Sequence, residues 1–123
     1  MVFGLLGVPQ IFVSGLAGAV NAGSAGYFGA LPGGRALVKW AGLSNAGVVA
    51  AGMWFGQDDP YLQSATAAIA CASMAGVMGL HVVRTAGSAG AHQLLHAKIA
   101  SATCGVLAVD QTVCTVMRRE KRW

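Results

Sequence analysis

Three histidines, at positions 81, 92 and 96, are the first residues of this sequence that could do chemistry. His92 and His96 are four residues apart, so their side chains share one face of a helix. His81 precedes them across a short stretch of small residues. Three imidazoles could bind zinc or copper, or one could be an axial ligand of haem or another pigment. No cysteine or carboxylate is placed to complete such a site, so we predict contacts with lipid phosphate or backbone groups, and no metal or cofactor.

Asp110 is the second such residue, because it lies inside an apolar segment between Lys98 and Arg118. An ionised carboxylate within a bilayer costs about 3 kcal/mol, so it must be neutral, paired or open to water. Lys98 lies about 18 Å away along the same helix and cannot be its partner. We expect a structural hydrogen bond or an ion pair to a neighbouring subunit. Proton transfer, as by the membrane carboxylate of a rotary ring, is one alternative, and a position at the interface is another.

Asn21 and Asn45 are amides inside apolar segments, where side chains of this type hydrogen-bond between helices. The sequence contains no Ser–His–Asp arrangement and no carboxylate pair in helical register. The stretches GLAG and GSAG lack the preceding strand and the following Lys-Ser/Thr of a nucleotide-binding loop. The sequence therefore predicts a protein that is not an enzyme.

The composition indicates where these residues lie. Of 123 residues, 55% are hydrophobic and 10% are charged, whereas soluble domains average about 25% charged. Eighteen glycines would make poor helices in water, but a lipid environment enforces helix and turns small residues into contact surfaces. The chain is therefore expected to be one transmembrane helical domain over residues 1–123, with its three cysteines buried.

Four apolar segments, each ending at a charge or a chain breaker, span about residues 9–31, 36–56, 61–83 and 94–117. Each is about 20 residues long, enough to cross about 30 Å of hydrocarbon. Trp40 and Trp54 mark the two ends of the second segment, as in an aromatic belt. We predict an all-α membrane protein with a bundle of about four transmembrane helices. Three spans plus an interfacial helix is the alternative, because Lys98 and Asp110 weaken the fourth segment.

Small residues recur every four positions along all four segments, and we predict that they form helix-packing faces. The third segment has small residues on nearly all its sides. Packing within the bundle would use one of these faces, which leaves a second close-packing surface for a partner subunit. The predicted packing residues are Gly18, Ala22, Gly26, Gly42, Ala46, Ala72, Gly76, Ser101 and Gly105.

The chain has a net charge of +4, and half of its basic residues lie in a tail at 118–123. A basic tail after a hydrophobic segment contacts anionic lipid headgroups or an acidic partner. The tail is short and no nucleic-acid-binding fold accompanies it, so nucleic acid is not an expected partner. The residues concerned are Arg118, Arg119, Lys121 and Arg122.

Two glycine-rich stretches, NAGSAG (21–26) and MAGVMGLHVVRTAG (74–87), resemble signatures of the transmembrane protein 14 family. They cover about a sixth of the chain. The resemblance implies a small helical protein of the mitochondrial inner membrane or another membrane, in a family linked to haem and lipid metabolism. The family's basic residue before the first AGS is replaced by Asn21, and SAGAHQLLHAK replaces its turn after the third helix. No functional residue is carried over.

Together these features predict a non-catalytic accessory subunit of a large inner-membrane complex, such as a mitochondrial respiratory-chain complex or ATP synthase. Its partners would be other membrane subunits of a hetero-oligomer, together with phospholipids. A transporter or channel component for a small metabolite, a proton or a porphyrin is the alternative. A pigment-binding photosystem subunit in a thylakoid membrane is a further alternative.

Overall fold

The computed structural model describes residues 10–30, 36–85, 87 and 90–121. Within these ranges every regular element is an α-helix. The elements are α1 (Gln10–Ala30), α2 (Ala36–Phe55), α3 (Pro60–Thr85) and α4 (Ala91–Lys121). The predicted all-α class and its four helices are confirmed.

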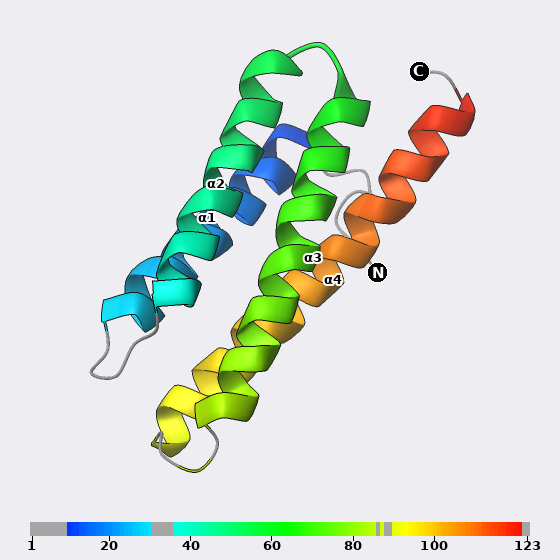
Figure 1. The fold of residues 1–123 in the computed structure, drawn as a ribbon. Coiled ribbons are helices and arrows are strands. Elements are labelled where there is room, and N and C mark those ends of the chain that lie inside the picture. The colour runs from blue at the N-terminus through cyan, green and yellow to red at the C-terminus, as the bar shows by residue number, and fades with distance from the viewer. Residues whose placement is uncertain (1–9, 31–35, 86, 88–89, 122–123) are drawn as a thin grey trace.

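The helices run alternately up and down, so each is antiparallel to the one before it (Figure 1). The helix α3 contacts the other three, and α1 contacts α2 more extensively than α4. In the described part of the chain α2 and α4 do not touch, and they lie on opposite sides of α3. The α1–α4 boundary is therefore the least closely packed contact of the bundle.

The buried positions of α2 show how the helices pack. They are Val38, Gly42, Asn45, Val49 and Gly52, which alternate spacings of four and three residues. The average of 3.5 residues is typical of left-handed helix packing. A Cβ atom at Gly42 would lie 2.5 Å from Cβ of Ala25 and 2.7 Å from the backbone oxygen of Asn21. Glycine is thus required where the α1 and α2 backbones meet.

Within this chain, the four-residue stripes of small residues do not form continuous packing faces between its own helices. A spacing of four advances about 40° per step on a helix of 3.6 residues per turn, so a long stripe winds around the helix. On α1, Ser14 is buried, whereas Ala22 and Gly26 are exposed. On α3, the stripe residues Ala72 and Gly76 are likewise exposed.

The turn between α2 and α3 is closed by capping contacts. The backbone N–H of Leu62 donates to Oδ1 of Asp59 at 3.3 Å, as expected for an N-cap residue, and Pro60 takes the first helical position. The side-chain amide of Gln63 donates to the backbone oxygen of Gly56 at 2.6 Å. These contacts hold the end of α2 against the start of α3.

The helix α4 extends beyond the expected segment at both ends. It begins at Ala91 and continues to Lys121, so part of the basic tail is helical. Arg, Glu and Lys have high helix propensity, and basic residues are favoured at a helix C-terminus. These residues can therefore continue the helix started by the apolar segment.

Two of the four helices are long and apolar enough to cross a membrane, in α3 at Tyr61–Arg84 and in α4 at His92–Met117. In α1 and α2, Gly, Ser and Asn dilute the apolar residues, and α2 also contains Lys39. The structure therefore supports fewer spans by length and composition than the four predicted.

Candidate functional site

A groove of about 380 Å³ lies between α1 and α4 and is open to the outside. Its α1 wall consists of Ala19, Val20, Gly23, Ser24, Tyr27 and Phe28, and its α4 wall of His96, Ile99, Ala100 and Thr103. We call it the α1/α4 groove. No atom lies within 4 Å of a Cβ built at Gly23, so this glycine leaves the space open. Most of the wall is apolar, and the polar groups of Tyr27 and His96 lie toward one end of the bundle.

At that end of the groove, two side chains from the two helices meet. The hydroxyl oxygen of Tyr27 lies 2.9 Å from Nδ1 of His96. Their rings are 5.5 Å apart in an edge-on arrangement, and Tyr27 also stands edge-on to Phe28 at 4.8 Å. With Tyr27 as donor, the neutral imidazole has its proton on Nε2. The pair then still offers one N–H donor and a hydroxyl oxygen that can accept.

The three predicted histidines occupy different environments. His81 is buried, with its ring 5.6 Å from that of Phe28. His92 is exposed, and its ring lies 6.5 Å from that of His96. Among the residues that the structure describes, no group of three His, Cys, Asp or Glu side chains could hold a metal ion. His96 alone lines the groove.

Asp110 belongs to a polar chain between α1 and α4 at the opposite end of the bundle. Its side chain is 1% exposed, and its Oδ2 accepts a hydrogen bond from the Gln111 amide at 2.8 Å. The Gln10 amide donates to Oε1 of Gln111 at 2.6 Å and to Oγ of Ser14 at 2.9 Å. The buried Asp110 side chain thus accepts from the Gln111 amide, and Gln111 is in turn bonded to Gln10 of α1.

The two predicted amides are buried and differ in their contacts. The Asn21 amide nitrogen donates to the backbone oxygen of Ala17 at 2.8 Å and lies 4.0 Å from Sγ of Cys71. The Asn21 carbonyl oxygen has no hydrogen-bond partner in the described structure. Asn45 donates to Oγ of Ser73 at 3.3 Å and so links α2 to α3. Only Asn45 makes a conventional hydrogen bond between helices.

The predicted packing residues divide into those that contact another helix and those that face outward. A Cβ at Gly42 would meet α1, and one at Gly18 would lie an ordinary 3.6 Å from Cγ1 of Val49. Ser101 donates to the backbone oxygen of Ala75 at 3.0 Å. Ala46 and Gly105 are half-buried, and a Cβ at Gly105 would meet nothing within 4 Å. The outward-facing members are Ala22, Gly26, Ala72 and Gly76.

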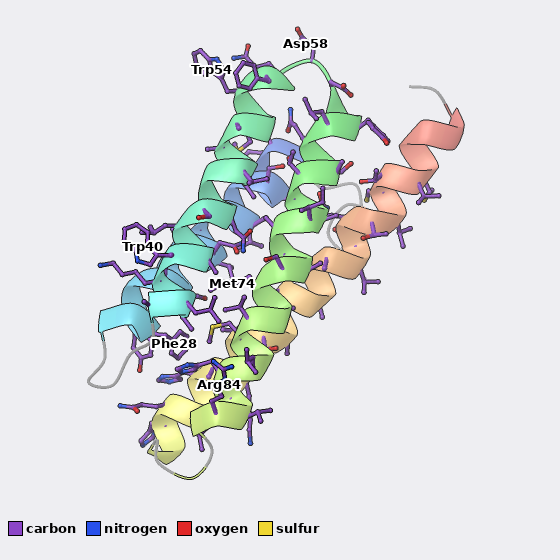
Figure 2. All side chains as sticks on the ribbon, viewed as in Figure 1. Phe28, Trp40, Trp54, Asp58, Met74 and Arg84 are labelled. Atoms are coloured by element: carbon purple, nitrogen blue, oxygen red, sulfur yellow. The ribbon has the colours of Figure 1, made fainter. Side chains whose placement is uncertain are left out.

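Among the side chains that the structure describes, the exposed charges at the two ends of the bundle differ in sign. Figure 2 shows Arg84 and Phe28 toward one end, and Trp54 and Asp58 at the other. Among the described side chains, Lys39, Arg84 and Lys98 lie toward the first end, and Asp58 and Asp59 at the second. The predicted lipid-contacting side chains of Arg118, Arg119, Lys121 and Arg122 lie outside the described residues. At the groove end with Tyr27 and His96, the described charged side chains are therefore basic.

Tyr27, Gln10 and Gln111 were not predicted as site residues. Tyr27 is an aromatic residue near a helix end, which is a signal for a membrane interface. Gln111 is next to Asp110 and Gln10 is near the start of an apolar segment, but no pattern in the sequence relates residues so far apart. Comparison of the chain with family models, with curated proteins and with solved structures finds no match.

Proposed function

We propose that this protein is a membrane-embedded, non-catalytic accessory subunit that braces the helices of a larger inner-membrane assembly. A mitochondrial respiratory-chain complex or ATP synthase is the proposed class of assembly. The composition supports a location in a membrane, and the resemblance to the transmembrane protein 14 family supports a mitochondrial one. All four helices are proposed to lie within the bilayer.

The distribution of polar and apolar side chains supports this location. Large hydrophobic side chains are exposed on every helix, including Phe12 on α1, Trp54 on α2, Val83 on α3 and Val109 on α4, each at least 64% exposed. Polar side chains are instead buried inside, among them Asn21, Asn45, Gln63, Asp110 and Gln111. An apolar exterior around a partly polar interior suits a lipid solvent, because polar groups need partners away from hydrocarbon.

The two longest apolar helices, α3 and α4, also support a location in the membrane. Only 39% of the apolar stretch in α3 and 33% of that in α4 is buried inside the chain. The core helix of a soluble protein would be mostly buried, because exposed apolar surface in water is unfavourable. These helices are suited to contact with acyl chains or with other membrane helices.

The proposal of a bracing role rests on glycines that lie within helices and are exposed at the surface of the chain. A Cβ at Gly15, Gly26, Gly47 or Gly76 would meet nothing within 4 Å, so the chain's own packing does not require glycine there. Each lies within a helix, where glycine costs about 1 kcal/mol relative to alanine. Close approach of a helix from another subunit would use them, since small residues let helix backbones come together in lipid.

Leucine substitutions of the outward-facing glycines test this role. The full chain, tagged in its native membrane and extracted in mild detergent, is expected to migrate on a native gel with a large complex. Gly26→Leu and Gly76→Leu should release it as a free chain, because a leucine would hold the partner helix away. Val109→Leu is the matched control, since a large side chain already stands at that exposed position, and it should stay in the complex.

Two results would overturn the proposal. Wild-type chain migrating alone would remove the partner, and both glycine variants remaining in the large complex would remove the role of the exposed faces. Mass spectrometry of the co-migrating band tests the proposed class. Absence of respiratory-chain and ATP synthase subunits from that band would exclude it while leaving a bracing role elsewhere.

A further inference from the structure

We propose that the α1/α4 groove binds one phospholipid, with an acyl chain along its apolar wall and the phosphate at the Tyr27–His96 end. This inference rests on the membrane embedding proposed above, but not on the partner complex. In a bilayer, acyl chains surround the bundle, so an open apolar groove on its outer surface is in contact with them.

The dimensions of the groove fit an acyl chain of one leaflet. On α1 its wall extends from Ala19 to Phe28, a rise of about 14 Å. One leaflet contributes about 15 Å of hydrocarbon to the bilayer. Three residues of the wall have a small side chain or none, so an acyl chain can lie close to the helix backbones. They are Ala19, Gly23 and Ala100.

The end of the groove lies where a headgroup would be. Tyr27 is near the last residue of α1, and His96 is in the second turn of α4. Trp40 is exposed near the adjoining end of α2, and such aromatic residues sit at headgroup level in membrane proteins. A ligand with its polar group at Tyr27 and His96 would thus have that group at the interface and its tail in hydrocarbon.

The basic side chains toward this end of the groove favour a lipid with a charged phosphate over one with a neutral headgroup. The exposed charged side chains toward this end, within the described residues, are Lys39, Arg84 and Lys98, and all are basic. The first turn of α4 contains no acidic residue, so its free backbone N–H groups are not occupied by a carboxylate of that turn. With Tyr27 donating to Nδ1 of His96, the Nε2–H of His96 adds a donor at the groove itself, and hydrogen bonds to a charged acceptor are the stronger kind.

The test compares two glycines of α1 that both have free space around them, of which only one lines the groove. Gly15 and Gly23 are both exposed, and a Cβ at either meets nothing within 4 Å, but only Gly23 lines the groove. The purified chain is reconstituted in vesicles of equal parts phosphatidylcholine and phosphatidylglycerol and extracted again in mild detergent. Native mass spectrometry then counts the phospholipids retained per chain.

We expect wild type and Gly15→Leu to retain phospholipid equally. Gly23→Leu should lower retention severalfold, because a leucine side chain would occupy the space along the wall that an acyl chain needs. His96→Leu should also lower it about tenfold through loss of a hydrogen bond to a charged group, with His92→Leu unchanged. The second pair of variants tests the headgroup end even if Gly23→Leu alters the packing of α4.

Equal retention in all four variants would overturn the phospholipid site. So would displacement of the phospholipid by a sterol or quinone when these are added to the vesicles, or crosslinks in native membranes from position 23 to a protein instead of to lipid. Failure of the membrane embedding itself is distinguished by alkaline extraction. A chain released from the vesicles by alkaline carbonate would contradict the proposed function before any lipid is counted.

Discussion

The side-chain amide of Gln10, in the first turn of α1, donates a hydrogen bond to Oε1 of Gln111 on α4 at 2.6 Å. Gln111 in turn donates to the buried carboxylate of Asp110. The helices α1 and α4 otherwise share little surface. The polar chain at one end and the Tyr27–His96 pair at the other therefore tie together two helices that enclose an open groove.

Replacement of Gln111 by Leu should destabilise the bundle by about 0.6 to 2 kcal/mol, because Asp110 loses a donor and Gln10 loses an acceptor within a buried region. The midpoint of unfolding by dodecyl sulfate, followed by circular dichroism, measures the change. Thr112→Val is the control, since the Thr112 hydroxyl bonds only the backbone of its own helix, at Ala108, among the described contacts. Equal effects of the two substitutions would contradict a specific role for the α1–α4 link.

The Tyr27–His96 pair should contribute a smaller amount. Tyr27→Phe keeps the ring contacts and removes the hydroxyl, and we expect a loss of about 0.5 to 1.5 kcal/mol. Tyr61→Phe provides the comparison, because no side-chain hydrogen bond of Tyr61 occurs in the described part of the chain. Unfolding of both variants in detergent should show a shift for Tyr27→Phe only. A matching shift for Tyr61→Phe would assign the effect to the general loss of a phenol group.

Gly42 and Gly47 should respond in opposite directions to alanine. A Cβ at Gly42 meets the α1 backbone, so Gly42→Ala must push α1 and α2 apart at a cost of about 1 to 3 kcal/mol. Gly47 lies on the same helix with open space, and Gly47→Ala should be neutral or stabilising by up to about 1 kcal/mol. Stability measurements on both variants in the same detergent give the comparison. Destabilisation by Gly47→Ala in the isolated chain would show that the open space is used within the chain.

Asp59 should matter for the start of α3, whereas Asp58 should not. Asp59→Ala removes the side-chain acceptor for the Leu62 N–H, and loss of such a cap costs about 1 kcal/mol. Asp58→Ala removes a neighbouring exposed carboxylate and should change stability by less than about 0.5 kcal/mol. Hydrogen exchange at the first amides of α3 should rise only in the Asp59 variant. Unchanged exchange there would show that the Gln63–Gly56 contact suffices to hold the turn.

The helices themselves follow from local information in the sequence. Apolar stretches separated by PGGR, QDDP and a Gly- and Ser-rich link predict four helices. The burial of Asp110, Asn21 and Asn45 in the structure accords with the high cost of exposing such groups to hydrocarbon. These features depend on residue type and on neighbours within one or two turns.

Which face of each helix is buried was decided only by the tertiary structure. The Gly and Ala residues occur on all sides of α1 and α3, so hydrophobicity alone does not orient these helices, and a four-residue stripe turns from the interior to the exterior along its length. Contacts of Gln10 with Gln111 and of Tyr27 with His96 join positions far apart in the chain. Such pairs exist because antiparallel packing aligns the two helices, and residue type alone does not encode that alignment.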